Sequence, residues 1–343
     1  MKVRILKACC MALVIFITTG CAGPIRSSAH PETRLSAWSA SWDMKSGMQE
    51  YAGMKDRLES LSYFAAYFNA KDQLVIPPEV LAARAETRRQ GKGPLAYLTI
   101  VNDWEKAPGK ATEKDLDVLR RVLADDASVD RHIAEILALA KAGAYDGIEI
   151  DYERLWKDEQ LTQRFLDFTY RLSRAAIGAN LKLRIVLEPS APFKAGFCQG
   201  PQYVVMLYNL YGTHSGPGPK ADGSFILKTL QSMEALPEDR AVAFATGGCQ
   251  WERGGILGLG TVSKRFIDEK EAAMLQQKYQ VKVERDPDSA AVFFDYEKDG
   301  HRYTVWYADS ETLNAWISLA ANNGIRQVSL WRLGSNTDIG EVR

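Results

Sequence analysis

The segment Tyr145-Asp-Gly-Ile-Glu-Ile-Asp-Tyr-Glu153 alternates acidic side chains with apolar or aromatic ones. On a β-strand, residues two apart share a face, so Glu149, Asp151 and Glu153 point the same way. The two isoleucines and the tyrosine between them point the other way. In a parallel barrel the outer face of a strand packs against helices, which suits isoleucine. The segment therefore predicts a barrel strand whose acids line the interior.

Short apolar or aromatic runs of similar length recur along the chain, with amphipathic helical stretches between many of them. Eight runs are predicted as strands: residues 35–42, 61–68, 94–101, 146–152, 182–188, 203–211, 240–246 and 326–333. Helices are predicted at 129–142, 158–178 and 310–323. Strand–helix alternation with nearly continuous apolar strands implies a parallel sheet buried on both faces. Eight such units predict an α/β fold, the (β/α)₈ or TIM barrel.

Two stretches interrupt this alternation. Residues 189–202 are too few and too rich in proline and glycine for a full helix. Residues 250–309 are too many for one connection, and within them Asp299-Gly300 marks the turn of a predicted hairpin. We therefore expect residues 34–343 to form the barrel, with a small β-rich insertion at about 250–309 between strands 7 and 8. Aromatic residues of the insertion expected to shape a cleft are Trp251, Trp306 and Tyr307.

The composition excludes several classes of protein. Lysine plus arginine and aspartate plus glutamate each number 43, so no net charge attracts nucleic acid, and none is expected as a partner. The chain has four histidines and no Cys-x-x-Cys motif, which argues against a structural zinc site. We expect a monomer that requires no metal or cofactor.

The first residues resemble a targeting segment. Residues 1–20 have a basic start and an apolar run that is too short to span a bilayer, which is typical of a signal peptide. The ending Thr18-Thr-Gly-Cys21 resembles a bacterial lipobox. We therefore expect residues 1–20 to be a lipoprotein-type signal peptide and residues 21–33 to be a tether. The protein would be exported and anchored to a bacterial membrane through lipid on Cys21, on the periplasmic or outer-membrane side. Plain secretion with cleavage nearby is the alternative.

Two further cysteines, Cys198 and Cys249, lie in the expected barrel. In an exported protein such a pair is able to form a disulfide. The sequence does not place the two residues in space, so it leaves both possibilities open.

A column of three carboxyls inside a protein has a chemical consequence. Burial and mutual repulsion both favour a retained proton somewhere in the column. A carboxylic acid with a raised pKa at the carboxyl end of a barrel strand suits general acid catalysis. The alternative is a solvated edge strand with alternating charge, which fits poorly with the apolar opposite face.

These acids carry a resemblance to a known family. Asp146-Gly-Ile-Glu-Ile-Asp-Tyr-Glu153 resembles the D-x-x-D-x-D-x-E signature of glycoside hydrolase family 18, which comprises chitinases and related endo-N-acetylglucosaminidases. Met206-Leu-Tyr-Asn209 resembles the M-x-Y-D of that family, and Trp331 stands where the family has a tryptophan on strand eight. The segment from Asp286 to Trp331 is similar to the branch that contains spore-germination and cortex-lytic enzymes.

The chain departs from the family pattern at three places. Glu149 stands where the family usually has aspartate, and Asn209 replaces the aspartate of M-x-Y-D. The S-x-G-G of strand three is absent, and residues 96–102 stand in its place. These departures weaken the case for an ordinary chitinase more than the case for hydrolysis, because Asp151 and Glu153 are intact.

The resemblance implies a retaining glycoside hydrolase that cleaves β-linked, N-acetylglucosamine-containing polysaccharide by substrate-assisted catalysis. It implies that Glu153 is the general acid and base, and that Asp151 orients the 2-acetamido group whose carbonyl oxygen attacks the anomeric carbon. Glu149 would tune Asp151 by sharing a proton, and Tyr208 would bind the acetamido oxygen. Further residues expected to bind substrate are Asn209, Trp331 beneath the sugar, Asp146 and Asn102.

Other functions remain open at this point. A non-catalytic, lectin-like glycan-binding protein of the cell envelope is able to use the same barrel, although such relatives usually lose the last glutamate of the signature. An envelope scaffold is a third possibility. Peptidoglycan, chitin and N-glycans are all possible substrates, and endo and exo action are not distinguished.

Overall fold

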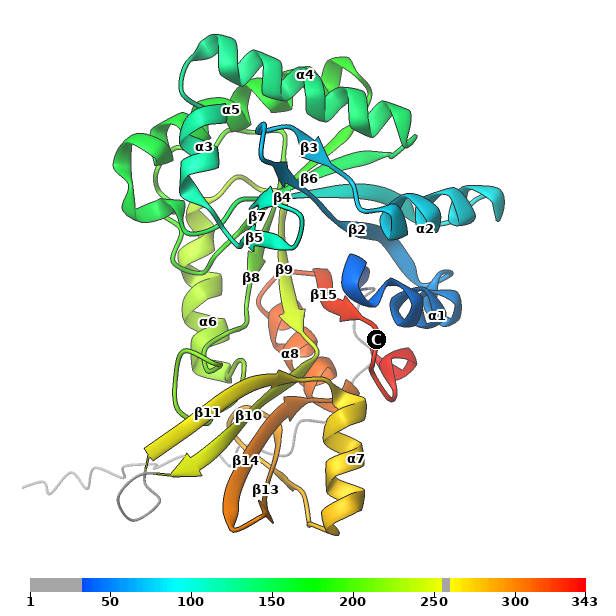
Figure 1. Ribbon diagram of the computed structural model, residues 1–343, viewed down its shortest axis with the longest axis vertical. Helices are drawn as coiled ribbons and strands as arrows, with labels where there is room; N and C mark the ends of the chain where they lie inside the picture. The colour runs from blue at the N-terminus through cyan, green and yellow to red at the C-terminus, as the bar shows by residue number, and fades with distance from the viewer. Residues whose placement is uncertain (1–32, 255–259) are drawn as a thin grey trace, which may run out of the picture. The chain divides into compact units, whose positions relative to one another are not determined.

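The computed structural model describes residues 33–254 and 260–343, and in them eight parallel strands close into a barrel (Figure 1). The predicted signal peptide, the lipidation site at Cys21 and nearly all of the tether lie outside the described residues. Around the barrel the strands are β2 (Leu58–Asn69), β1 (Arg34–Ala40), β15 (Gln327–Leu333), β9 (Arg240–Ala245), β8 (Gln202–Met206), β7 (Lys182–Leu187), β6 (Gly147–Asp151) and β4 (Leu95–Ala107), which pairs with β2 again. The predicted (β/α)₈ barrel is confirmed.

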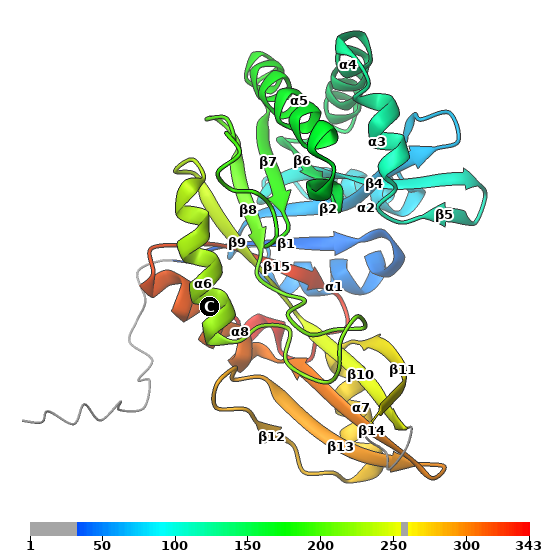
Figure 2. The same cartoon turned by 90° about the vertical axis from the view of Figure 1, so that its left-hand side faces the viewer.

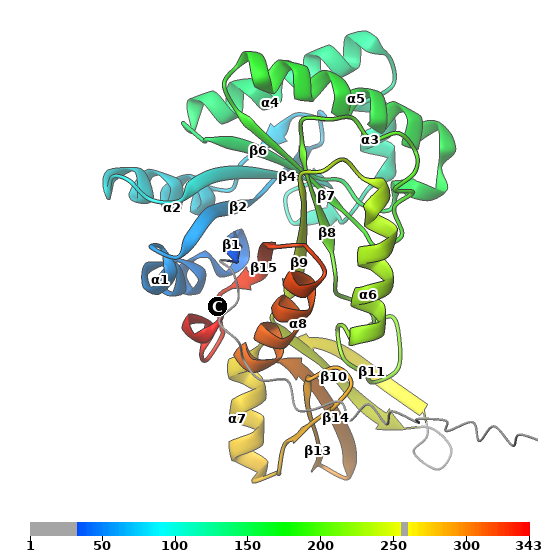
Figure 3. The same cartoon turned by 180° about the vertical axis from the view of Figure 1, so that it is seen from behind.

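Helices cover the outside of the barrel. They are α1 (Met44–Met54), α2 (Pro78–Arg89), α3 (Leu116–Val122), α4 (Asp126–Ala142), α5 (Glu159–Gly178), α6 (Gly223–Ser232) and α8 (Ser310–Asn322). Figure 3 shows α6 and α8, which contact each other, on the outside of the strands. Helix α5 illustrates why these segments are helical. Its apolar side chains recur at helical spacing, so Leu161, Phe165 and Phe168 are all buried. The Asp158 side chain caps its first turn by accepting from Leu161 N at 3.0 Å.

The insertion forms a second sheet with its own helix. Its strands are β10 (Gly247–Gly254), β11 (Gly260–Ile267), β12 (Glu284–Arg285), β13 (Val292–Lys298) and β14 (His301–Ala308), and its helix is α7 (Glu269–Tyr279). The predicted turn is present, because Lys298 pairs with His301 and both Asp299 and Gly300 have positive φ. The β-rich insertion between barrel strands 7 and 8 is confirmed.

Two hairpin-like extensions flank the carboxyl ends of the barrel strands. One joins the end of β4 to β5 (Lys110–Thr112), and the other is the antiparallel pair β10–β11. A further short strand, β3 (Leu74–Val75), extends β2. Figure 2 shows the β4–β5 and β10–β11 extensions projecting from the same end of the barrel. They stand on opposite sides of its mouth, because β4 and β9 are four strands apart in the ring of eight.

The barrel interior has two distinct layers. In the middle, buried polar side chains surround an ion pair between Arg184 and Glu149. Nearer the carboxyl ends, a smaller apolar cluster includes Trp38, Tyr208 and three alanines of β9. Alanine at residues 241, 243 and 245 leaves room for the larger aromatic rings that pack in and against this cluster.

Cys198 and Cys249 are both free. Cys198 lies next to Tyr203 at the amino end of β8, whereas Cys249 lies in β10, beyond the carboxyl end of β9. The two residues therefore belong to opposite ends of the barrel. Within the described ranges, we find no helix that has both the length and the apolar character required to cross a membrane.

Candidate active site

A cavity of about 530 Å³ opens at the carboxyl ends of the barrel strands. Barrel residues, the segment that follows β5 and the insertion all contribute to its wall. This is the end of a (β/α)₈ barrel at which catalytic groups are found. Most of the residues singled out from the sequence line it: Asp151, Glu153, Tyr208, Asn209, Trp331 and Asn102.

Two carboxyls lie in the cavity wall at the end of β6. Asp151, the last residue of the strand, is only 7% exposed, and its Oδ1 has no hydrogen-bond partner among the described residues. Burial raises the pKa of Asp151 well above its usual range, and the charge of Glu153 adds to this effect. Glu153 lies two residues further on, with 17% of its side chain exposed. Burial also raises the pKa of Glu153, against the opposing charge of Lys114.

The backbone of Glu153 is held by Asn102 on β4. The Asn102 side chain accepts from Glu153 N at 2.9 Å and donates to Glu153 O at 3.2 Å. It also donates to Asp115 O at 3.2 Å. Asn102 is buried, and the protein backbone already uses its amide. Asn102 therefore positions Glu153, and its expected role in substrate binding stays a prediction, because it also lines the cavity.

Lys114 forms an ion pair with Glu153 that sequence reasoning missed. Its Nζ lies 2.6 Å from Glu153 Oε2. Lys114 follows β5 in the left-handed conformation, and its backbone N donates to Asp103 Oδ1 at 2.8 Å. The ion pair thus brings the β4–β5 extension against the acid at the end of β6. Burial lowers the pKa of Lys114, but the charge of Glu153, its hydrogen bond to Lys114 and the charge of Asp151 together outweigh this effect, so the pKa is raised.

Glu149 lies below the cavity and does not line it. Its carboxylate is 0% exposed, with Arg184 Nε 3.2 Å from Oε2. It also accepts from Thr99 Oγ1 at 2.7 Å, from Ser62 Oγ at 3.3 Å and from the Trp38 indole. We find no hydrogen bond between Glu149 and Asp151 in the described structure, so proton sharing between them stays a prediction. Glu149 acts on Asp151 through its charge, which helps to raise the pKa of Asp151.

Aromatic side chains form part of the cavity wall. Trp331 on β15 contacts Phe64 with ring centroids 4.6 Å apart and Trp38 with centroids 5.8 Å apart. Trp42, which follows β1 and is 64% exposed, lies edge-on to Trp331. Exposed aromatic faces beside carboxyls suit the apolar faces of sugar rings, whereas most large apolar side chains of this chain are buried.

Tyr208 and Asn209 follow β8 and both line the cavity. Burial raises the pKa of the Tyr208 hydroxyl well above its usual range, and the charges of Asp151 and Glu153 act in the same direction. The hydroxyl is therefore a neutral hydrogen-bond donor at ordinary pH. Asn209 is exposed and has φ 65°. Asparagine tolerates this left-handed conformation better than most residues.

Asp146 is placed wrongly by the sequence interpretation. It precedes β6 at the amino end of the strand, where its side chain accepts from Ala96 N at 2.8 Å. Five residue steps along the strand, about 16 Å, separate it from Asp151 at the other end. Asp146 therefore stabilises the pairing of β4 with β6 and does not reach the cavity.

The prediction that three aromatic residues of the insertion shape the cleft is also wrong. Trp251 is fully buried, Tyr307 is buried and Trp306 stacks on Phe293, so none of the three lines the cavity. The insertion instead contributes Phe266 of β11, which is 61% exposed. Trp251 is covered by the segment that follows β8, because its indole donates to Ser215 O at 3.1 Å, and Tyr307 packs in the separate apolar cluster of the insertion.

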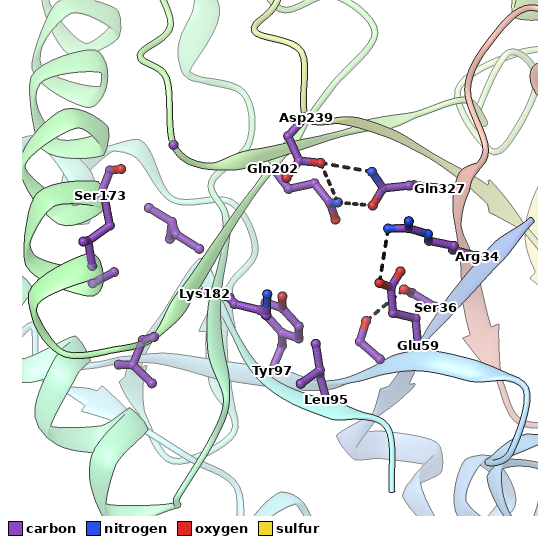
Figure 4. Close-up of a pocket in the computed structure, with 16 residues that line it drawn as sticks. Arg34, Ser36, Glu59, Leu95, Tyr97, Ser173, Lys182, Gln202, Asp239 and Gln327 are labelled. Atoms are coloured by element: carbon purple, nitrogen blue, oxygen red, sulfur yellow. Dashed lines mark hydrogen bonds and ion pairs between the residues drawn. The ribbon is translucent and has the colours of Figure 1, made fainter.

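A second cavity, of about 340 Å³, lies at the opposite end of the barrel (Figure 4). It is lined by residues at the amino ends of the strands, including Arg34, Gln202 and Gln327. Its polar groups bond to one another: Gln202 Nε2 and Gln327 Nε2 donate to Asp239 Oδ1 at 3.0 and 3.1 Å. Polar groups that satisfy one another at the amino end of a barrel serve stability, so the chemistry is assigned to the carboxyl end.

Residues 33–254 and 260–343 contain no cluster of three or more histidine, cysteine, aspartate or glutamate side chains arranged to hold a metal ion. The expectation that the reaction requires no metal stays a prediction.

Comparison with known proteins identifies relatives of this chain, although no family model matches it. An uncharacterized glycosylase, YvbX, of Bacillus subtilis is 25% identical over 239 residues, which cover 65% of this chain and 67% of the relative. The cortical fragment-lytic enzyme of Bacillus cereus is 24% identical over 295 residues, covering 81% of this chain but 65% of that enzyme. The chain thus spans just under two thirds of the latter's length.

A solved structure agrees with these sequence relatives. The chitinase from Chromobacterium violaceum superimposes with a TM-score of 0.76 at 18% identity, covering 90% of this chain and 96% of that one. At this identity the likeness shows a shared fold. Taken with the sequence relatives, it confirms the predicted resemblance to glycoside hydrolase family 18: the chain is similar to glycoside hydrolases of the chitinase and cortex-lytic type.

Proposed function

We propose that this protein is a retaining glycoside hydrolase that cleaves β-linked polysaccharide containing N-acetylglucosamine. One observation carries the proposal: Asp151 and Glu153 lie together in the wall of an aromatic-lined cavity, and burial raises the pKa of both. Two acids with raised pKa at the carboxyl end of a barrel strand supply a proton donor and a group able to stabilise positive charge.

In the first step Glu153 would protonate the glycosidic oxygen of the leaving sugar. Its raised pKa keeps a proton available, and its partial exposure in the cavity wall allows contact with substrate. Asn102 fixes its backbone, so the carboxyl is positioned before substrate arrives. After the leaving sugar departs, the same carboxylate would accept a proton from a water molecule whose oxygen attacks the anomeric carbon and displaces the acetamido oxygen. Two successive displacements at that carbon retain its configuration.

The nucleophile would be the carbonyl oxygen of the substrate's own 2-acetamido group. Asp151 Oδ1 has no partner in the described structure and is free to accept the acetamido N–H. The Tyr208 hydroxyl, kept neutral by its raised pKa, would donate to the acetamido oxygen. Holding nucleophile and electrophile in one sugar removes a bimolecular encounter, which is worth roughly 7–11 kcal/mol in favourable cases.

Substrate scope tests this proposal. N-Acetylchitotetraose should be cleaved, whereas its de-N-acetylated counterpart and cellotetraose should not, because neither carries the acetamido nucleophile. Product analysis by mass spectrometry and anomer analysis by NMR would measure this, with the β-anomer formed first. Efficient cleavage of cellotetraose, or inversion at the anomeric carbon, would contradict substrate assistance. Tight binding of N-acetylchitotetraose without any turnover would instead favour the lectin-like function.

The ion pair between Lys114 and Glu153 leads to a prediction about the pH dependence of kcat/KM. The ammonium of Lys114 favours the ionised form of Glu153 and so opposes the rise in its pKa. Lys114→Met should therefore raise the pKa of Glu153 further. A general acid must be protonated, so activity is lost as pH rises through that pKa, and the alkaline limb of kcat/KM should move to higher pH.

The matched control is Lys106→Met. Lys106 lies on the same β4–β5 extension, is exposed, and does not line the cavity. Its removal should leave the alkaline limb in place. If the alkaline limb of the kcat/KM profile is unchanged in Lys114→Met, or moves to lower pH, Glu153 does not act as the general acid in the way proposed.

The cell envelope is the proposed setting. The lipoprotein-type start predicted from residues 1–21 supports export and attachment to a bacterial membrane, which would place peptidoglycan within reach. Two sequence relatives are named as a cortical fragment-lytic enzyme and a glycosylase, which supports a cell-wall glycan as substrate.

A further inference from the structure

Lys220 is a basic residue of the cavity that the proposed reaction does not use. It lies between β8 and α6 and lines the cavity together with Thr246, Phe266 and Arg332. Its Nζ donates to Thr246 O at 3.2 Å and lies 5.6 Å from the centre of the Phe266 ring. An ammonium has three N–H groups, so two remain for a ligand.

Acidic neighbours on this side of the cavity already have partners. Asp43 binds Arg332 at 2.6 Å, and Glu271 binds Arg265 at 2.6 Å. Asp268 caps helix α7 by accepting from Glu271 N at 2.7 Å. All three carboxylates thus have partners other than Lys220.

Lys220 has no such partner. Across the described ranges, no carboxylate lies within ion-pair distance of its Nζ. Burial lowers the pKa of Lys220; the Cys249 thiol opposes this effect, and the charge of Arg332 adds to it. A partly buried ammonium beside a second cation is unfavourable without an anion, so a ligand carboxylate bound there would gain a strong hydrogen bond.

Lys220 and Glu153 line the same cavity from different parts of its wall. Thr246 follows β9, whereas Glu153 follows β6 and contacts the β4–β5 extension. Strands β6 and β9 are three places apart in the ring of eight, so a glycan chain bound over Glu153 is able to extend toward Lys220. Phe266, exposed beside Lys220, offers a ring face to a sugar at that position.

We propose that Lys220 is a specificity-determining residue that binds a carboxylate carried by the glycan, namely the lactyl carboxylate of muramic acid in peptide-free peptidoglycan strands. This inference rests on the proposed glycosidase function and names its substrate class. Chitin carries no charge and would leave the ammonium without a partner. A stem peptide converts the lactyl carboxylate into an amide, which accepts a hydrogen bond but carries no charge, so strands without peptides should be preferred.

The experiment compares two tetrasaccharides of alternating N-acetylglucosamine and N-acetylmuramic acid. One carries free lactyl carboxylates and the other carries lactyl carboxamides of nearly the same shape. The wild-type protein should cleave the carboxylate form with a kcat/KM about tenfold higher or more, as expected for a charge-assisted hydrogen bond. Lys220→Met should reduce this preference to about twofold or less, chiefly through KM, and Lys220→Arg should retain most of it.

Lys228→Met is the matched control. Lys228 is exposed on α6 and does not line the cavity, so its removal changes the net charge equally and should keep the preference. Circular dichroism would verify that each variant is folded. Equal kcat/KM values for the two tetrasaccharides in the wild type, or a preference that persists in Lys220→Met, would overturn the inference.

N-Acetylchitotetraose separates the two levels of the argument. If the wild type cleaves N-acetylchitotetraose but has the same kcat/KM for both muramic tetrasaccharides, the glycosidase function is supported and the proposed role of Lys220 is refuted. If nothing is cleaved, the proposed function fails, and calorimetry of binding to the two tetrasaccharides still tests Lys220. Tighter binding of the carboxylate form that disappears in Lys220→Met would then support a carboxylate site on a non-catalytic protein, and equal binding would refute it.

Discussion

Glu153→Gln is expected to lower kcat on N-acetylchitotetraose by about three orders of magnitude, within the range that general acid–base catalysis supplies. Glutamine has nearly the same shape and is able to accept from Lys114, but it has no proton to give to the leaving oxygen and takes none from water. The backbone contacts with Asn102 do not involve the side chain and should persist. Steady-state kinetics and circular dichroism would measure both effects.

The leaving group provides a sharper test of the role of Glu153. A 4-nitrophenyl glycoside needs little protonation to depart, so Glu153→Gln should cost much less activity on its first bond cleavage than on N-acetylchitotetraose. A purely structural defect would slow both substrates alike. Glu284→Gln on β12, an exposed residue outside the cavity, removes the same charge and should retain full activity. Turnover of N-acetylchitotetraose above about a tenth of the wild-type rate would exclude Glu153 as the acid.

The barrel was predictable from the sequence because the strands are buried on both faces and hence nearly continuous in apolar residues. The alternation around Glu149 also placed Asp151 and Glu153 on the inner face correctly. Helices α1, α2, α3, α6 and α7 were not predicted. Helix α2 illustrates the reason, since its sequence PEVLAARAETRR is largely polar and buries only Val80, Ala83 and Thr87. Packing against β2 stabilises it more than any periodic pattern reveals.

The sequence analysis did not identify the basic residues of the site, for two different reasons. Lys114 and Lys220 lie in connections, where no periodicity relates them to Glu153. Arg184 lies within β7 and did have a signal: it is a charged residue in the apolar run Lys182-Leu-Arg-Ile-Val-Leu187. In the observed register Arg184 is directly opposite Glu149. The presence of an arginine in one buried strand and a glutamate in the neighbouring strand indicates an ion pair. That pair would have shown that one carboxylate of the acidic column is neutralised by a positive charge.

Arg184→Met is expected to lower the free energy of unfolding by about 3–5 kcal/mol, which is the usual cost of removing one partner from a buried ion pair. Arg184 is 2% exposed, and besides Glu149 it donates to Ser329 Oγ at 2.6 Å and to Ser60 Oγ at 3.3 Å. Methionine fills much of the same space but leaves the Glu149 carboxylate buried without a countercharge. Urea unfolding followed by tryptophan fluorescence would measure the loss.

A double variant distinguishes the charge from the packing. Glu149→Gln in the Arg184→Met background removes the unpaired carboxylate while preserving its shape, so the combined loss should fall short of the sum of the single losses by about 1 kcal/mol or more. Arg120→Met is the control, because its pair with Asp158 is partly exposed and worth less than about 1 kcal/mol. Additive losses in the double variant would mean that Arg184 stabilises the barrel by packing against Trp38 and Tyr97 alone.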